Sequence, residues 1–231
     1  MTHFDYLVWL LSLPAPIYIV ARLAARHELP RYFALAFYCL ATSAVSIGDF
    51  AILKICGIGS MEYIYAYYYG ESVLAVVLFL VVLGLFRQLL EDMGAALYVR
   101  VAGILLLGRT AWISFMIVQD SRAHMTSRFV VELGRNLSFV GVVLVYLLWM
   151  AIMKLHESRT RMIQIALALG IYFSVYALCY GLRQSHPDWT IAKIALPIVS
   201  TFLFYSWAYT LTQIPEEARL ATARVAALAT R

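Results

Sequence analysis

Seven long apolar stretches, separated by short polar segments, dominate the pattern of the chain. Each is close to the roughly 20 residues that an α-helix needs to cross the hydrocarbon core of a bilayer. The third is the clearest, because no charged residue occurs between Ser72 and Phe86. The pattern predicts an all-α polytopic membrane helix bundle with seven transmembrane helices. These are expected at Tyr6–Arg22, Tyr32–Ile52, Ile64–Phe86, Val99–Val118, Phe129–Met153, Met162–Leu182 and Ile191–Leu211.

Three prolines fall inside these stretches. Pro14 and Pro16 predict a kink in the first helix, and Pro197 predicts a bend in the seventh, because proline removes a backbone donor from the helix.

Composition excludes a soluble globular protein and a disordered one. Hydrophobic residues make up 63% of the 231 residues, charged residues make up 13%, and the mean hydropathy is +0.81. A soluble domain is nearer half apolar and a quarter charged. The expected environment is therefore the lipid bilayer. The net charge of +5 is attributed to basic loops at the membrane surface, and no nucleic-acid partner is expected.

The distribution of Lys and Arg predicts an orientation. With the N-terminus outside, eleven of the 18 basic residues fall in cytoplasmic segments, five fall outside, and Arg109 and Arg135 lie within helices. Basic residues gather in cytoplasmic loops, so the sequence favours an N-out, C-in protein of the inner (cytoplasmic) membrane of a cell. Met1–Asp5 lacks the basic start of a signal peptide.

The short loops leave room for one domain only. We expect a seven-helix transmembrane domain over residues 1–212 and a cytoplasmic tail over residues 213–231. In the tail, Pro215 followed by Glu216 is typical of a helix start. A short amphipathic helix on the membrane surface and a frayed tail are both compatible with this segment.

Five ionisable residues within the predicted helices are the main candidates for function: Asp49, Glu71, Arg109, Glu132 and Arg135. Charged side chains inside a membrane are costly, so each is a functional hypothesis by default. In the predicted topology Arg109 lies near the middle of its helix, and the other four lie in the outer half of the bundle.

Helical spacing adds aromatic and polar neighbours to these charges. Residues three or four apart share one face of a helix. This rule groups Glu132 with Arg135 and Asn136, Arg109 with Trp112, and Tyr63 with Tyr67 and Glu71. The functional interpretation is an outward-facing polar and aromatic pocket for a small polar or amphipathic ligand. The structural alternative is that Glu132 pairs with Arg135, Glu71 pairs with Arg109, and the tyrosines form an interfacial belt.

No cofactor or metal is expected. No histidine falls in the middle of a predicted helix, and no ligand spacing typical of a metal site occurs. The H-E-x-x-H and G-x-S-x-G patterns are also absent, so an enzyme is not favoured, although Asp49 and Glu71 leave intramembrane acid–base chemistry open. Cys56 and Cys179 both fall near the predicted outer surface, and their pairing is left open.

Segment Tyr65–Ser72 reads YAYYYGES and is followed by the apolar run to Phe86 and Arg87. Together with the arginine-rich first loop, it resembles a set of small, uncharacterised bacterial seven-helix membrane proteins over roughly the first 90 residues. Members often carry a further acid near the end of the third helix, where this chain has Leu83–Leu85. The resemblance implies the architecture and no activity. Microbial rhodopsins, which share seven helices, need a lysine deep in the seventh, whereas Lys193 lies near its outer end.

These observations predict a small seven-helix sensor or ligand-binding protein. Its short loops imply that any signal passes through a separate cytoplasmic or membrane protein. An accessory or structural subunit of a larger membrane complex is the first alternative, and a small transporter or channel is the second.

Overall fold

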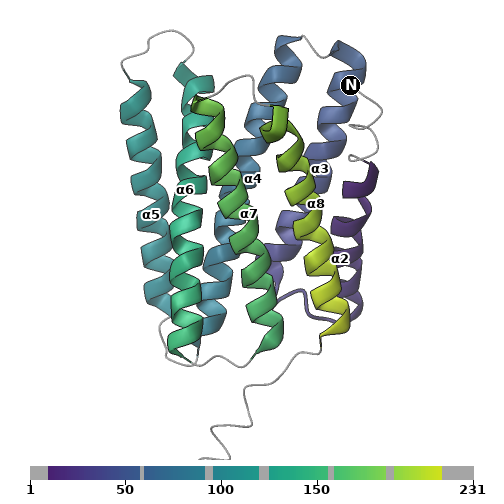
Figure 1. Cartoon of the computed structure of the whole chain (residues 1–231), viewed down its shortest axis with the longest axis vertical. Helices are drawn as coiled ribbons and strands as arrows, with labels where there is room; N and C mark the ends of the chain where they lie inside the picture. The colour runs from purple at the N-terminus through teal and green to yellow at the C-terminus, as the bar shows by residue number, and fades with distance from the viewer. Residues whose placement is uncertain are drawn as a thin grey trace, which may run out of the picture.

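The structure is a computed structural model that describes residues 10–57, 60–91, 96–119, 125–155, 159–185 and 190–214. Within these ranges the chain is entirely helical, with seven α-helices joined by short connections (Figure 1). They are α2 (Pro14–Ala25), α3 (Phe33–Cys56), α4 (Met61–Leu90), α5 (Ala96–Val118), α6 (Met125–Lys154), α7 (Thr160–Ser185) and α8 (Thr190–Gln213).

Where the structure describes them, the seven apolar stretches that the sequence marks are almost entirely helical, and most helices extend a few residues beyond them. The first differs, because the helix is interrupted at Leu13 and α2 begins at Pro14. Proline is well suited to this first helical position, where its missing N–H has no partner to lose. Pro197 lies inside α8. The predicted tail helix lies outside the described residues.

Five helices in the described part of the chain are long and apolar enough to cross a membrane: α3, α4, α5, α6 and α7. The remaining two are α2, which belongs to a shorter apolar segment (Leu10–Ala25), and α8. Five such helices in one chain indicate a multi-pass membrane protein.

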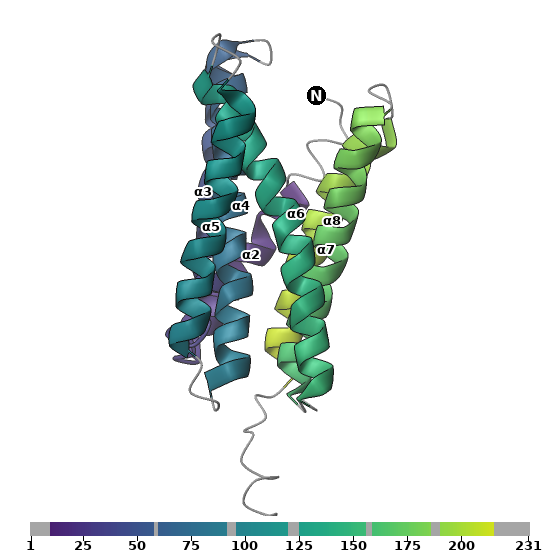
Figure 2. The same ribbon diagram turned by 90° about the vertical axis from the view of Figure 1, so that its left-hand side faces the viewer.

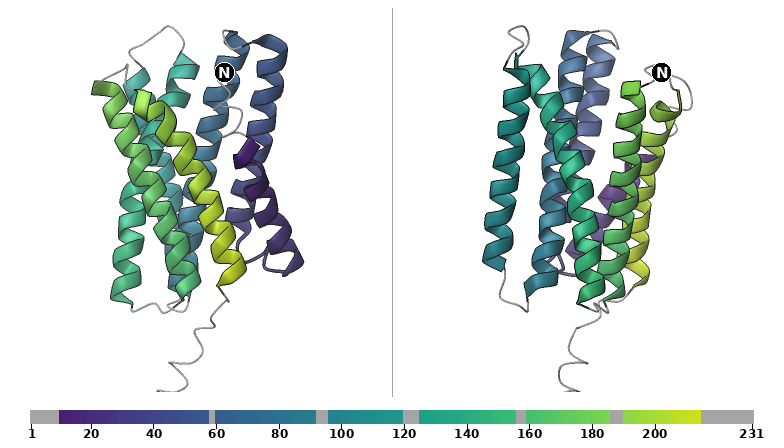
Figure 3. Two further views of the ribbon diagram at one scale, coloured as in Figure 1. Left: turned by 45° about the vertical axis from the view of Figure 1, so that its right-hand side comes forward. Right: turned by 60° about the vertical axis from the view of Figure 1, so that its left-hand side comes forward.

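Six helices form a closed ring, and α5 lies outside it. Around the ring, α2 packs on α3, α3 on α4, α4 on α6, α6 on α7, α7 on α8, and α8 on α2 again. Helix α5 packs mainly against α6 and α4, at the edge of the bundle (Figures 1 and 3). Consecutive helices run in opposite directions, which gives the bundle two ends. We call them the Arg161 end, where α7 begins and α8 ends, and the Tyr63 end, where α4 begins.

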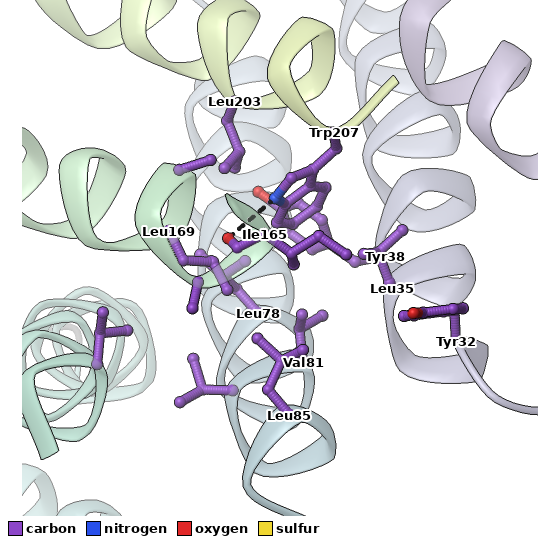
Figure 4. Packing of buried hydrophobic residues seen from close by; sticks show 14 of the residues in the cluster. Tyr32, Leu35, Tyr38, Leu78, Val81, Leu85, Ile165, Leu169, Leu203 and Trp207 are labelled. Carbon is purple, nitrogen blue, oxygen red and sulfur yellow. Dashed lines mark hydrogen bonds between the residues drawn. The ribbon is translucent and has the colours of Figure 1, made fainter. Parts of the chain in front are cut away.

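The hydrophobic core fills the ring mainly in the half next to the Arg161 end. Trp207, Leu203 and Leu211 of α8 are fully buried there with Ile165 and Leu169 of α7. The indole Nε1 of Trp207 donates to the Ile165 carbonyl across 3.4 Å, which satisfies its polar atom inside the core (Figure 4). Toward the Tyr63 end, α7 and α8 diverge from α3, α4 and α5, and α6 crosses from one group to the other (Figure 2).

Candidate functional site

A carboxylate inside the ring, Glu71 of α4, is contacted by a tyrosine of α7, the helix beyond α6 in the ring. The Tyr176 hydroxyl of α7 donates to Glu71 Oε2 across 3.3 Å. Both side chains are half-buried. Ser60 caps the start of α4, since its hydroxyl accepts a hydrogen bond from the Tyr63 N–H, and Glu71 lies about three turns inside the helix. The contact therefore joins α4 and α7 at membrane depth.

Two more tyrosines extend this contact toward the core. The Tyr172 and Tyr176 rings stack with centroids 5.6 Å apart, and the Tyr38 side chain of α3 interacts with both Tyr172 and Glu71. Tyr38 also packs on Phe204, with ring centroids 5.7 Å apart. We call Glu71, Tyr38, Tyr172 and Tyr176 the Glu71–tyrosine group. It draws on three helices and leads from the half-buried carboxylate into the closed core.

The sequence alone marks only one member of this group, Glu71. Tyr172 and Tyr176 are four residues apart within an apolar stretch, which is the same spacing that singled out Tyr63 and Tyr67. That spacing was the available signal for the α7 pair. No pattern in the sequence marked Tyr38, because its partners come from other helices.

Asp49 of α3 belongs to the same region. It is half-buried and is an electrostatic neighbour of both Glu71 and Tyr63. The two helices approach closely here because Gly70 has no side chain: a Cβ at Gly70 would lie 2.7 Å from Val45 Cγ1. The ring of Tyr63 lies 6.5 Å from that of Tyr67, which is exposed. The structure thus brings together Asp49, Glu71 and Tyr63 from the sequence-predicted set.

The predicted α6 residues lie in two separate contacts. Arg135 and Glu132 form an ion pair at 2.5 Å, which is the structural alternative that the sequence offered for these residues. Asn136 Nδ2 donates to Ser114 Oγ of α5 across 3.0 Å, and the Ser114 hydroxyl donates to the Thr110 carbonyl. Asn136 therefore fastens α6 to α5.

Arg109 and Trp112 lie on the outward surface of α5, away from the Glu71–tyrosine group. Trp112 is 62% exposed and Arg109 is also exposed. Arg109 makes no ion pair with Glu71 or with any other described residue. An arginine at the centre of a membrane helix costs about 2.5–3.5 kcal/mol on insertion scales, so its exposure needs an explanation.

A second charged cluster, at the Arg161 end, was not expected from the sequence, where Arg161 is one of the eleven basic residues counted in cytoplasmic segments. Its guanidinium lies 2.9 Å from a Glu28 carboxylate oxygen and donates to the Leu211 carbonyl at 3.1 Å, and its side chain is only 2% exposed. It also lies over the Tyr32 ring, 5.3 Å from the centroid. Arg161 thus ties the start of α7 to the end of α8 and to the α2–α3 connection.

The turn after α2 places Glu28 for this contact. His27 has a positive φ of 56°, and the Glu28 N–H donates to the Leu23 carbonyl while the His27 N–H donates to the Ala24 carbonyl. This is the Schellman arrangement that commonly ends helices, usually with glycine at the left-handed position. His27 therefore has a strained backbone conformation at the position just before Glu28.

The structure bears on two further possibilities, a disulfide and a metal site. Cys39, Cys56 and Cys179 are free thiols, so Cys56 and Cys179 are not bonded to each other. Within the described residues, no group of three or more His, Cys, Asp or Glu side chains is arranged to hold a metal ion.

Comparison of the chain with family models, with curated proteins and with solved structures finds no match. The resemblance of the first 90 residues to bacterial seven-helix proteins therefore stays a prediction. Any function has to be argued from the residues of the chain itself.

Proposed function

We propose that the protein is a small membrane sensor that binds an amphipathic cation at the Glu71–tyrosine group. The observation that carries this proposal is a pair of half-buried acids without a cationic partner. Neither Asp49 nor Glu71 forms an ion pair with a described Lys, Arg or His, and the hydrogen-bond partner of Glu71 is a neutral tyrosine. Acids in such a setting favour a ligand that carries the missing positive charge.

The neighbouring side chains suit the same ligand. Tyrosine rings attract cations over their faces, and Tyr172 and Tyr176 present stacked rings beside the carboxylate. A primary or quaternary amine with a modest apolar group would gain from both features. The proposed ligand class is therefore a small organic amine, within the wider class of small amphipathic ligands.

Helix α7 offers a path for the signal. It carries Tyr176 near one end and Arg161 near the other, 15 residues apart. At 1.5 Å per residue this is about 22 Å along the helix axis. A ligand that displaces Tyr176 from Glu71 would shift α7. Through Arg161, it would also shift the C-terminal end of α8. The output then passes to a separate protein.

The proposed topology has seven spans, with the Tyr63 end outside and the Arg161 end in the cytoplasm of the cell. The excess of Lys and Arg in the connections at the Arg161 end supports it. Cys56 tests the orientation, because it is an exposed thiol at the Tyr63 end and the other two thiols are buried. A membrane-impermeant maleimide should label wild-type protein in intact cells and leave Cys56→Ser unlabelled. Labelling of Cys56 only in inverted vesicles would reverse the proposed orientation.

Ligand binding is tested by thermal unfolding of purified protein with graded amines, from tetramethylammonium to benzyltrimethylammonium, and with their uncharged isosteres. A ligand present at 100 times its dissociation constant stabilises the folded protein by about 2.7 kcal/mol. We expect stabilisation by amines alone, lost in Glu71→Gln and weakened in Tyr176→Phe. Glu132→Gln is the matched control, because this acid already pairs with Arg135. Equal responses of Glu71→Gln and wild type would reject the site.

The accessory-subunit alternative has one observation in its favour, which is the exposed Arg109 on α5. The transporter alternative has less support, because the described residues inside the ring near the Arg161 end are closely packed and largely apolar. A flux assay in proteoliposomes with the same amines separates transport from sensing.

A further inference from the structure

The outward face of α5 is not covered by any of the six helices of the ring in the described part of the chain. Helix α5 is long and apolar enough to span a membrane, yet only 22% of its most apolar window is buried, the lowest share among the five candidate spans. Its exposed residues at helical spacing are Ala102, Leu105, Arg109, Trp112 and Met116. We call these the Arg109 face.

Arg109 lies near the middle of this span. It is 13 residues after the start of α5 and nine before its end, so about 20 Å and 14 Å along the helix axis from the two ends. Side chains in a helix tilt toward its N-terminus, so Arg109 leans away from the nearer end. This direction disfavours snorkelling of the guanidinium to the nearer membrane surface.

The two glycines of α5 differ, and only Gly108 lies beside the Arg109 face. A Cβ at Gly103 would lie 2.4 Å from Leu83 Cδ1, so this glycine is explained by close packing against α4. A Cβ at Gly108 would meet no atom within 4 Å, and Gly108 lies next to Arg109 on the exposed side. Glycine in a membrane helix allows the backbone of another helix to approach closely. Nothing within the described chain uses that approach at Gly108.

We infer that the Arg109 face docks a transmembrane helix of a different protein, and that this helix carries an Asp or Glu near mid-membrane. The carboxylate would neutralise Arg109, and the partner backbone would lie against Gly108 beside Trp112. Arginine and tryptophan are the residue types most enriched where binding energy concentrates at interfaces. This inference stands apart from the proposed ligand site, and it supplies the surface that a separate output protein needs.

A second copy of the chain does not fit this face. A two-fold contact through it would set Arg109 against Arg109 in a medium that screens charge poorly. A head-to-tail contact needs an exposed acid at the same depth. Among the described helices, Asp49, Glu71 and Glu132 are half-buried, whereas the exposed Glu62 lies at the start of α4. The charge therefore calls for a carboxylate from another chain.

The first test uses the full chain in lipid vesicles and synthetic helical peptides. The peptides are Leu- and Ala-rich, about 20 residues long as a span requires, and carry a single central Glu, Gln or Lys. Energy transfer between labelled peptide and labelled protein reports association. We expect the Glu peptide to bind wild-type protein at least tenfold more tightly than the Lys peptide, and Arg109→Glu to reverse that order. Equal binding of the three peptides, or an order unchanged in Arg109→Glu, would overturn the inference.

Two variants distinguish binding to a specific surface on α5 from attraction to a mid-membrane charge alone. Gly108→Ile should abolish binding of the Glu peptide and leave thermal unfolding unchanged, because its side chain would point into open space. Ile47 of α3 is 54% exposed and lies 14 residues into its helix, at a depth close to that of Arg109. The double variant Arg109→Leu/Ile47→Arg keeps a mid-membrane charge but moves it off α5. Full binding by this double variant would show that charge alone suffices and would overturn the docking surface.

The second test is made in native membranes with a photo-crosslinking residue at Leu105, one turn from Arg109, or at Ile47 as the control. We expect a protein adduct at Leu105 alone, lost in Arg109→Gln, with a partner whose crosslinked segment contains an intramembrane acid. A self-adduct of twice 26.1 kDa, or crosslinks to lipid alone, would overturn the inference. Neither result would alter the amine-binding test at Glu71, so the two proposals fail separately.

Discussion

The two ends of the bundle differ in how they treat polar groups, although both are built from the same helices. Near the Arg161 end, α8 buries Leu203, Phe204, Trp207 and Leu211, and the charge of Arg161 is neutralised inside the protein. Near the Tyr63 end, α4 has no buried side chain between Met61 and Gly70. The difference suggests that one half supplies stability and the other keeps polar groups accessible.

The acids make the contrast specific. At the Arg161 end, Glu28 faces a guanidinium that is almost fully buried. In the other half, Glu71 accepts a hydrogen bond from the Tyr176 hydroxyl and forms no ion pair with a described residue, and its side chain is half-buried. A binding site needs groups whose interactions are incomplete until the ligand arrives. The Glu71 half meets this condition and the Arg161 half does not.

The largest expected effect comes from breaking the buried ion pair. Arg161→Ala should destabilise the protein by about 3–5 kcal/mol, because it leaves Glu28 without its partner at a largely buried position. Arg135→Ala is the control in the other half, and it should cost about 1 kcal/mol or less, since that pair is 21–33% exposed. Unfolding in mixed micelles measures both. Equal losses of unfolding free energy in the two variants would contradict the proposed difference between the two halves.

Two tryptophans provide the next comparison. Trp207→Ala should cost about 3–5 kcal/mol, because the side chain is fully buried and its removal leaves a cavity. Trp112→Ala should change the unfolding free energy of the isolated protein little, because its ring is 62% exposed. The same unfolding assay applies. A large loss for Trp112→Ala would mean that α5 is packed more completely than described here.

Replacing two glycines by alanine should change the free energy of unfolding by smaller amounts and in opposite directions. A Cβ at Gly141 would lie 2.3 Å from Phe173 Cε1, so Gly141→Ala should cost about 1–3 kcal/mol by overpacking α6 against α7. A Cβ at Gly48 would meet nothing within 4 Å, so Gly48→Ala should stabilise α3 by up to about 1 kcal/mol. Changes of the same sign in thermal unfolding would contradict this assignment.

The smallest effect concerns the turn that leads into Glu28. His27→Gly should stabilise the protein by roughly 0.5–1 kcal/mol, because glycine relieves the left-handed strain but also adds freedom to the unfolded chain. His27→Ala is the control and should give no gain, since it keeps a Cβ at positive φ. A gain in both variants would point to the imidazole rather than to the backbone.

Much of the architecture could be predicted from the sequence, because a span of about 20 apolar residues has few other stable states in a membrane. The site could be predicted only in part. Tyr63 and Glu71 lie on one helix, where spacing gives their relation, and Asp49 joins them through the close approach at Gly70. Tyr176 comes from a helix 105 residues away along the chain, which no local pattern relates to Glu71.

Arg109 and Trp112 illustrate a different limit. Their spacing predicts one shared face of α5, but it does not tell whether that face turns inward or outward. Helix α5 is apolar on nearly all sides, so the sequence offers no contrast from which to choose. Arg161 differs in the opposite way. A basic residue beside a loop is expected at the surface, but Arg161 is buried against Glu28, which comes from another part of the chain.

The position of α5 outside the ring also constrains how the protein is made. Helix α4 packs mainly on α3 and α6 and less on α5, which follows it, so a nascent chain that has completed α5 still lacks one of the two main partners of α4. The ring closes only when α8 has been made and reaches α2. Closure of the ring must therefore wait for α8, and until then the face of α2 that packs on α8 has to be covered by lipid or by insertion factors.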